Sequence, residues 1–367
     1  MSMNALVYTA PNQKAWMLVP MPKMQSPTDA IVKLTSTTIC GTDLHILKGD
    51  VPSVTRGRIL GHEGVGIVHS VGNSVSNVKP GDRVIVSCIT SCGKCIYCSS
   101  NLQAHCLNGG WILGNEIDGT QAEYVRIPYA DTSLYAAPSA LKDETLLMLS
   151  DALPTGFEVG VQSAKLAPGN TVAIVGAGPV GLAALITAQF YCPTSIIVID
   201  TDDYRLAVAE RIGATRVINP NRLTKNSVLD EIIQLMKSDG VSNDGVTSQN
   251  PKPGVDVAIE CVGLPQTFDT CQKIIAPGGR IANVGVHGRS VDLQLQDLWS
   301  KNVSITTGLV SANTTSMLLK ILQHGKMNPS ALITHRFKLS QIEKAYDIFG
   351  NAAKEHAIKM CITADDI

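Results

Sequence analysis

Four cysteines that lie close together in the sequence could hold a metal ion. The motif is Cys-x2-Cys-x2-Cys-x7-Cys, and it occupies fifteen residues: Cys92, Cys95, Cys98 and Cys106. Four thiolates complete a tetrahedron around Zn²⁺ and leave no position open, which is typical of a structural zinc site. An iron–sulfur cluster also takes four cysteines, and reactive free thiols are a third reading. The short gaps favour structural zinc.

A second set of possible metal ligands is dispersed along the chain. Cys40 and His62 lie in glycine-rich sequence that predicts turns, and Asp151 lies where the sequence pattern changes. Taken singly, such a cysteine is more often a small buried hydrophobic residue, and such a histidine a core residue. Together, three ligands and an open fourth position would form a catalytic zinc site. Glu63, next to His62, is a possible exchangeable ligand.

A glycine-rich motif in the middle of the chain could bind a dinucleotide. Residues 176–181, GAGPVG, fit G-x-G-x-x-G after the apolar run Thr171–Val175 and before an apolar stretch that predicts a helix. Gly176 would make the tight turn, Gly178 would admit a pyrophosphate, and Gly181 would let helix and strand pack closely. Pro179 and Val180 would bind the cofactor with them, at the positive end of the helix dipole.

An acidic residue follows this motif at the expected distance. The apolar run Ser195–Ile199 ends at Asp200, nineteen residues after Gly181. A carboxylate there can accept hydrogen bonds from the ribose hydroxyls of NAD and would repel the 2′-phosphate of NADP. The alternative is that Asp200 only caps the next helix. Arg205, the one cation nearby, is expected one turn into that helix and facing solvent; Arg205 and Val284 complete the predicted cofactor-binding residues.

Composition limits the class of protein. The chain has 367 residues, which predicts two domains, and its 44% hydrophobic and 17% charged content is globular. A net charge of −1 argues against nucleic acid or an anionic membrane as partner. No apolar run reaches the roughly 18 residues that span a bilayer. The first residues lack the pattern of a signal peptide or an import leader, so the expected location is cytoplasmic.

The elements that must position these residues fall into two groups. Up to about residue 152 the short alternating segments predict antiparallel strands, closer to a barrel than to a βαβ unit. From there on strands alternate with helices, which predicts a doubly wound parallel sheet. Its six predicted strands are Thr171–Val175, Ser195–Ile199, Arg216–Ile218, Asp256–Glu260, Arg280–Val284 and Ser304–Thr307.

The last part of the chain is expected to return to the first group. It predicts helices at Thr315–His324 and Gln341–Gly350, an extended piece around Phe337, and a final strand in the apolar run HAIKMCI. The predicted domains are therefore 1–152 together with 310–367, and 153–309. The polar segment Ser238–Pro253 is predicted to be a surface insertion.

These motifs together resemble the zinc-dependent medium-chain alcohol dehydrogenase family, and in particular its microbial NAD(P)-dependent primary and secondary alcohol dehydrogenases. The likeness covers essentially the whole chain. It is carried, in order, by CGTDLH (40–45), GHEGVGIVHSVGNSVSNVKPGDRV (61–84), the four-cysteine loop, LPTG (153–156) and GAGPVG (176–181). The resemblance implies an α/β chain with a GroES-like, β-rich catalytic domain and a Rossmann domain that binds NAD.

The resemblance also implies roles for single residues. The family's catalytic zinc ligands fall on Cys40, His62 and Asp151, although many members have a second cysteine in place of Asp151. Asp43 falls on the position that orients the ligand histidine. The zinc of such enzymes lowers the pKa of a bound alcohol, whose hydride passes to the nicotinamide. Thr42 would take the proton and pass it through the cofactor ribose to His45.

The remaining expectations follow from the same resemblance. Two zinc ions per subunit, one catalytic and one structural, would accompany NAD, a small alcohol, aldehyde or ketone substrate, and a homodimer or homotetramer. Cys88 and Trp111 are expected to line the substrate pocket, with core packing as the alternative. Two other functions stay open: a polyol or amino-alcohol dehydrogenase of the same superfamily, and a non-catalytic cofactor-binding member.

Overall fold

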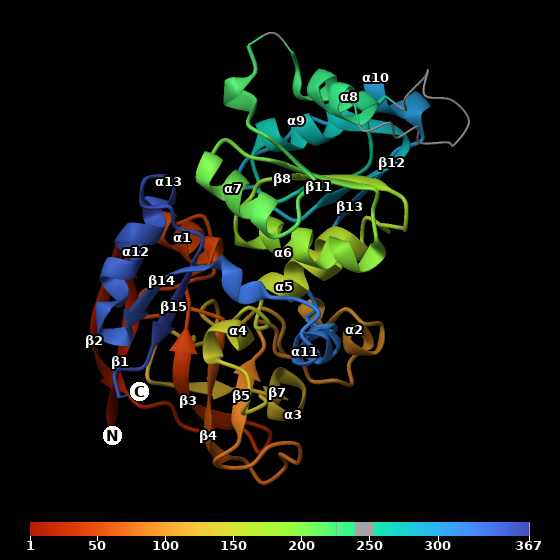
Figure 1. The fold of residues 1–367 in the computed structure, drawn as a ribbon. Coiled ribbons are helices and arrows are strands. Elements are labelled where there is room, and N and C mark those ends of the chain that lie inside the picture. Colours follow the sequence, from red (N-terminus) through yellow and green to blue (C-terminus); the bar gives the residue numbers. More distant parts are fainter. Residues whose placement is uncertain (225, 239–252, 367) are drawn as a thin grey trace. The chain divides into compact units, whose positions relative to one another are not determined.

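The chain folds into two compact units, Met1–Pro154 with Val310–Ile367, and Thr155–Leu309. A computed structural model describes residues 1–224, 226–238 and 253–366 (Figure 1). The predicted insertion at 238–253 therefore lies almost wholly outside the described residues. Among the described helices, none combines the length and the apolar character that crossing a bilayer requires.

The second unit is built on a parallel sheet of six strands. Their order is β10-β9-β8-β11-β12-β13, and every neighbouring pair is parallel. All five residues of each of the neighbouring strands β8 and β9 are buried, which explains why both sequences are apolar after their first residue. The strands are β8 (Thr171–Val175), β9 (Ser195–Ile199), β10 (Arg216–Ile218), β11 (Val255–Glu260), β12 (Ile275–Asn283) and β13 (Ser304–Thr307).

The predicted doubly wound sheet is confirmed, with three differences at strand ends: β11 begins at Val255 rather than Asp256, and both ends of β12 differ. β12 begins at Ile275 rather than Arg280, because Ile275 already pairs with Val255 before a shift in register. Val284 consequently lies just after the strand, where its backbone N–H donates to the Glu260 carbonyl (2.8 Å). The helices of this unit are α6 (Pro179–Ala188), α7 (Asp203–Arg211), α8 (Val228–Ser238), α9 (Pro265–Ile274) and α10 (Leu295–Leu298), with a π-helix at Gly156–Gln162.

The first unit is rich in antiparallel strands, as predicted. Its larger sheet has seven strands in the order β14-β15-β3-β4-β5-β7, with β6 also paired to β3, and β1 forms a hairpin with β2. The strands are β1 (Ser2–Ala10), β2 (Gln13–Pro20), β3 (Ala30–Thr37), β4 (Gly64–Val71), β5 (Arg83–Val86), β6 (Tyr124–Ile127), β7 (Leu134–Ala136), β14 (Ile333–Lys338) and β15 (Lys359–Thr363).

The two ends of the chain share one hydrophobic core. β15 pairs antiparallel with β3, so the predicted return of the last strand to the first unit is confirmed. Leu6 and Ile39 from the start of the chain pack in the same buried cluster as Tyr346 and Met360. The helices of this unit are α1 (Gly41–Lys48), α2 (Ile96–Ser99), α3 (Ala130–Ser133), α4 (Asp143–Leu147), α11 (Thr315–Gln323), α12 (Ile342–Gly350) and α13 (Ala352–Glu355); α5 (Ala152–Thr155) ends where the second unit starts.

Candidate metal centres and dinucleotide site

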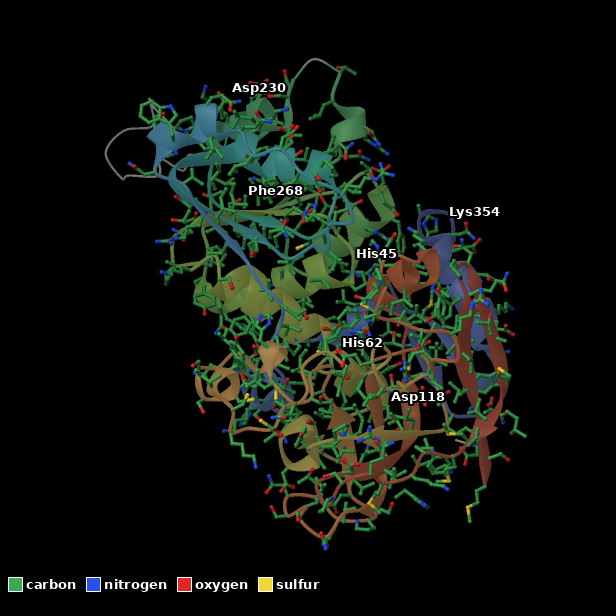
Figure 2. All side chains as sticks on the ribbon, turned by 180° about the vertical axis from the view of Figure 1, so that it is seen from behind. His45, His62, Asp118, Asp230, Phe268 and Lys354 are labelled. Carbon is green, nitrogen blue, oxygen red and sulfur yellow. The ribbon has the colours of Figure 1, made fainter. Side chains whose placement is uncertain are left out.

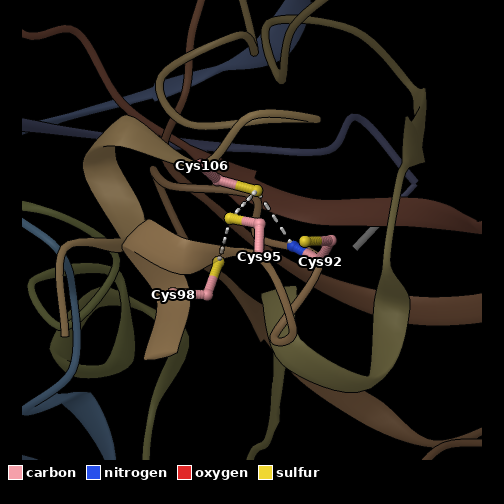
Figure 3. Close-up of side chains that lie close together, drawn as sticks. All are labelled: Cys92, Cys95, Cys98 and Cys106. Carbon is pink, nitrogen blue, oxygen red and sulfur yellow. Dashed lines mark hydrogen bonds between the residues drawn. The ribbon is translucent and has the colours of Figure 1, made fainter. Parts of the chain in front are cut away.

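The four cysteines of the loop converge on one point (Figure 3). Their sulfur atoms all lie within 4.8 Å of one another. The sulfur of Cys95 lies 3.5 Å from that of Cys98 and 3.9 Å from that of Cys106. Two thiolates bound to one tetrahedral zinc at 2.3 Å each would have their sulfurs about 3.8 Å apart. The loop therefore has the dimensions of a closed zinc site.

The thiols of this loop have very different proton affinities. Backbone N–H groups of Cys98 and Leu107 lower the pKa of Cys95 to about 6, whereas burial raises the pKa of Cys98 to about 12. A divalent cation would draw such thiols to the thiolate form, since metal binding displaces their protons. The cysteines all lie in the described part of the chain, and none forms a disulfide.

The dispersed candidate ligands also come together. Single ligand atoms of Cys40, His62, Glu63 and Asp151 lie within 4.8 Å of one another. Oδ2 of Asp151 is 3.7 Å from the Cys40 sulfur and 3.5 Å from Nε2 of His62. Cys40 follows β3, His62 precedes β4 and Asp151 precedes α5, so three separate parts of the first unit build the cluster.

The cluster is buried and polar. His62 is 4% exposed, Glu63 1% and Asp151 8%. Burial by itself would lower the pKa of His62, but its hydrogen bonds with Asp151 and Cys40 raise that pKa well above the ordinary value. The surrounding acids therefore favour a positive charge at this place, which a metal ion would supply.

Lys359 from β15 lies against the cluster. Its Nζ donates a hydrogen bond of 2.7 Å to Oε1 of Glu63, and both side chains are 1% exposed. Although burial disfavours the ammonium, the Glu63 carboxylate raises the pKa of Lys359 above its ordinary value. Burial raises the pKa of Glu63, and the Lys359 charge opposes that shift. Oε2 of Glu63 is buried and has no hydrogen-bond partner, so one oxygen stays available to a cation.

Asp43 faces the other side of the His62 ring. Its Oδ1 lies 4.0 Å from Nδ1 of His62, and both atoms are buried without a hydrogen-bond partner. This is the arrangement expected of a ligand histidine, because a metal on Nε2 leaves Nδ1–H to donate to a carboxylate. These unpartnered atoms and the donor set fit a zinc ion.

Thr42 and His45 lie on helix α1. Figure 2 labels His45 on this helix. Cys40 is the N-cap residue of this helix and donates its backbone N–H to Asp43 (2.8 Å), which satisfies the helix start. Oγ1 of Thr42 lies 3.6 Å from the Cys40 sulfur. His45 is three residues further on the helix, its side chain is 29% exposed, and its Nδ1 lies 2.9 Å from Oδ2 of Asp50.

The two expected pocket residues differ in their surroundings. The Trp111 ring lies edge-on to the His62 ring, with centroids 6.3 Å apart. Cys88 is 2% exposed, and its backbone N–H donates to the carbonyl of Ser150, next to Asp151. Trp111 thus borders the metal cluster directly.

The glycine motif of the second unit has the geometry that its sequence suggests. Gly176 has φ +104°, a conformation that favours glycine, and a Cβ on Gly181 would lie 1.8 Å from the Gly176 carbonyl oxygen. Gly178 is the N-cap residue of α6, and a Cβ there would meet nothing closer than 4.0 Å. Two glycines are therefore needed for folding, and the third leaves open space at the helix N-terminus.

Asp200 is tied to this glycine loop. Its Oδ2 accepts from the Ala177 backbone N–H at 2.6 Å, and its Oδ1 accepts from that of Asp202 at 2.9 Å. The residue that caps helix α7 is Asp202, whose side chain accepts from the N–H groups of Tyr204 and Arg205. The alternative role of Asp200 as the cap of this helix is therefore wrong.

The expected position of Arg205 is also wrong. Arg205 lies in the first turn of α7, its side chain is only 23% exposed, and its Nε lies 3.7 Å from Oδ2 of Asp202. A methyl group on Gly178 would lie 4.0 Å from Nη1 of Arg205. The guanidinium therefore lies beside the glycine loop and is only partly exposed to solvent.

Three polar residues that lie at or near the Cys40, His62 and Asp151 cluster were not predicted from the sequence. They are Lys359, Gln121 and Tyr346. Lys359 had one signal, since it is a charged residue within the run HAIKMCI, where apolar residues lie on both sides of it. Gln121 and Tyr346 had none, because nothing in their neighbouring residues indicates what they contact.

Comparisons with known proteins agree with this architecture. Residues 26–139 match the family model "Alcohol dehydrogenase GroES-like domain", and residues 179–324 match "Zinc-binding dehydrogenase". An alcohol dehydrogenase of Cupriavidus necator is 34% identical over 380 residues, which cover 98% of each chain. The structure of zinc dependent alcohol dehydrogenase 2 from Streptococcus pneumonia, in its apo form, is similar with a TM-score of 0.88 and 51% identity, over 99% of each chain. An alcohol dehydrogenase from Thermus sp. ATN1 has a TM-score of 0.86 and 31% identity, over 99% of this chain and 100% of that chain.

A GroES-like unit and a Rossmann unit with clustered Cys, His and Asp side chains define an oxidoreductase of the zinc-binding dehydrogenase class. This chain belongs to the zinc-dependent medium-chain alcohol dehydrogenase family.

Proposed function

We propose that this protein is a zinc-dependent alcohol dehydrogenase that moves hydride reversibly between a primary or secondary alcohol and NAD. The observation that carries the proposal is the buried cluster of Cys40, His62 and Asp151 in a chain of this family. Bound zinc would supply Lewis acidity, and NAD would accept the hydride. The four-cysteine loop would hold a second, structural zinc, which gives two per subunit.

The protein's own side chains have separable tasks in this reaction. Cys40, His62 and Asp151 would hold the catalytic zinc and leave a fourth position for the substrate oxygen. Lys359 holds Glu63 beside them. Thr42 would accept the alcohol proton at Oγ1. His45, three residues further on the same helix, would receive it and release it to water.

Zinc analysis tests the metal assignment. We expect two zinc ions per chain in the native protein and one in Cys40→Ala. The turnover of Cys40→Ala and His62→Ala should vanish while NADH fluorescence still reports binding, because these residues lie outside the unit that carries the glycine motif. Cys192→Ala, which changes an exposed cysteine, is the control and should keep both ions. A native chain with one zinc ion or none would instead favour a non-catalytic cofactor-binding member.

We propose NAD rather than NADP because of Asp200. A carboxylate beside a 2′-phosphate costs several kcal/mol, and at about 1.4 kcal/mol per decade this gives NAD a preference of roughly a hundredfold. Relatives do not decide the question, since one from Escherichia coli (25% identical) was solved with NADH and one from Sinorhizobium meliloti (26% identical) with NADP. Arg205, beside the glycine loop, is the one feature that could favour a phosphate.

The ratio of kcat/KM with the two cofactors tests this choice. Asp200→Asn, which keeps the shape and removes the charge, and Asp200→Gly should both lose most of the preference for NAD. Asp203→Gly is the matched control, because Asp203 is an exposed acid three residues away that pairs with Arg222. Equal use of NADP by the native chain would refute the assignment. If Arg205→Ala weakens NAD and NADP equally, Arg205 serves both cofactors.

The second candidate is an amino-alcohol or polyol dehydrogenase. An L-threonine 3-dehydrogenase of Bacillus licheniformis is 30% identical over 90% of this chain. A screen of short primary, secondary, cyclic and aromatic alcohols against polyols and threonine, with NAD, separates the two. The homodimer or homotetramer and the cytoplasmic location stay predictions, and light scattering tests the first.

A further inference from the structure

A chain of buried hydrogen bonds leads from helix α12 to Asp43, whose Oδ1 faces the histidine of the candidate catalytic site at 4.0 Å. The Tyr346 hydroxyl lies 2.8 Å from Oε1 of Gln121, and Nε2 of Gln121 lies 3.2 Å from Oδ2 of Asp43. Tyr346 is 2% exposed, Gln121 0% and Asp43 1%. A chain of buried polar groups without solvent needs every member satisfied, so such a chain fixes the geometry of its members.

The direction of each hydrogen bond is set by chemistry. Nε2 of Gln121 also lies 3.1 Å from the Thr38 carbonyl oxygen. A carbonyl and a carboxylate can only accept, so the amide NH₂ of Gln121 must point at Thr38 and Asp43. Its amide oxygen then faces Tyr346, whose hydroxyl must donate. Burial raises the pKa of Tyr346 well above its ordinary value, and the nearby Asp43 charge adds to this, so the proton stays on the hydroxyl.

Gln121 is held in place by the backbone around it. Its N–H donates to the Leu60 carbonyl at 2.9 Å, and its carbonyl accepts from the N–H of Leu6 at 2.8 Å. The Gln121 side chain also packs closely against Gly61, the residue before His62. A Cβ on Gly61 would lie 2.6 Å from Cγ of Gln121. The side chain of Gln121 therefore has little freedom to turn away from Asp43.

Asp43 connects Gln121 with His62. The N–H of Cys40 and the amide of Gln121 both donate to Oδ2 of Asp43, which leaves Oδ1 facing Nδ1 of His62 at 4.0 Å. We infer that Gln121 and Tyr346 are positioning residues for the metal site: they fix the rotation of the Asp43 carboxylate, so that it orients the His62 ring with Nε2 toward the zinc. This inference rests on the proposed catalytic zinc at Cys40, His62 and Asp151.

Two nearly isosteric variants test the inference. Tyr346→Phe removes only the hydroxyl, and Gln121→Met removes the amide while keeping the length of the side chain. We expect each to release the catalytic zinc to a chelator roughly tenfold faster than the native chain, in line with the usual effect of residues that support a metal ligand. In the cobalt-substituted protein, each should also shift the visible bands of the catalytic ion.

Tyr135→Phe is the matched control, because it removes a tyrosine hydroxyl that donates to the Ala312 carbonyl at 3.0 Å in the same unit. It should leave the zinc release rate and the cobalt spectrum of the catalytic ion unchanged. In an Asp43→Asn background, Tyr346→Phe should raise the rate of zinc release by less than about twofold. The reason is that Tyr346 is inferred to act through the Asp43 carboxylate, which this background has already removed.

The outcomes separate this inference from the proposed function. If Tyr346→Phe and Gln121→Met match Tyr135→Phe in both measurements, the positioning role is refuted even though zinc binds. If Tyr346→Phe has its full effect without the Asp43 carboxylate, the route through Asp43 is refuted. If the native chain binds no metal at Cys40 and His62, the proposed function is refuted, and the inference that rests on it is refuted too. Should Gln121→Met not fold, Tyr346→Phe alone decides.

Discussion

The buried ion pair between Lys359 and Glu63 gives the sharpest stability prediction. Both side chains are 1% exposed and 2.7 Å apart. Removing one member of such a pair leaves a buried charge without compensation and costs about 3–5 kcal/mol. Lys359→Met keeps most of the aliphatic stem, so its cost should arise from the lost charge. The folding equilibrium constant should fall by roughly two to three decades or more, at about 1.4 kcal/mol per decade.

Urea unfolding of the zinc-loaded protein measures this cost. Trp16 and Trp111 pack against the hydrophobic core of the first unit, and Trp299 lies in the second, so fluorescence in a Trp299→Phe background reports the unit that holds Lys359. The double variant Lys359→Met/Glu63→Gln should recover most of the lost stability, because it removes both charges together.

A surface pair provides the comparison. Lys33 and Asp366 also form an ion pair, but their side chains are 40% and 60% exposed. Solvent screens such a pair, so Lys33→Met should cost less than about 1 kcal/mol. The reasoning is refuted if Lys359→Met costs no more than Lys33→Met, or if the double variant is no more stable than Lys359→Met alone.

Three further predictions follow from the other sites. Cys95→Ser should lose one zinc ion per chain and lower the melting temperature by about 5 °C, since a loss near 2 kcal/mol shifts a unit of this size by that much; unchanged zinc content and melting temperature would count against a structural site. His45→Ala should slow alcohol oxidation most below about pH 8, where buffer replaces a lost proton acceptor poorly, and an unchanged pH–rate profile would leave His45 without that role. Gly181→Ala should destabilise the second unit, because its Cβ would lie 1.8 Å from the Gly176 carbonyl oxygen, whereas Gly178→Ala should fold normally and bind NAD more weakly. Calorimetry and NADH titration distinguish these two variants, and equal effects on folding would contradict the assignment.

The sequence by itself determined the features whose parts are neighbours in the chain. The four cysteines lie within fifteen residues, so a tight loop is enough to bring their sulfurs together. The glycine motif follows a buried strand and precedes a helix, and this local order predicts both the parallel sheet and its turn. Strand composition predicted β8 and β9 to the residue, because strands buried on both faces are continuously apolar.

Helix α1 and the partial burial of Arg205 were not predicted, because both depend on contacts. Gly41 and Thr42 are weak helix formers, so the local sequence does not indicate a helix. The helix starts there because the backbone N–H of Cys40, its N-cap residue, donates a hydrogen bond to Oδ2 of Asp43. Arg205 lies beside the glycine loop, where its Nε is 3.7 Å from Oδ2 of Asp202.

Only the tertiary structure decided what surrounds the candidate catalytic ligands. Cys40 and Asp151 are 111 residues apart in the chain, Gln121 and Tyr346 are 225 apart, and Glu63 and Lys359 are 296 apart. Residue types at such separations carry no local signal of contact. The fold brings them together because β15 returns to β3 and closes one core from both ends of the chain, so the last strand places a lysine against an acid beside the first unit's cluster.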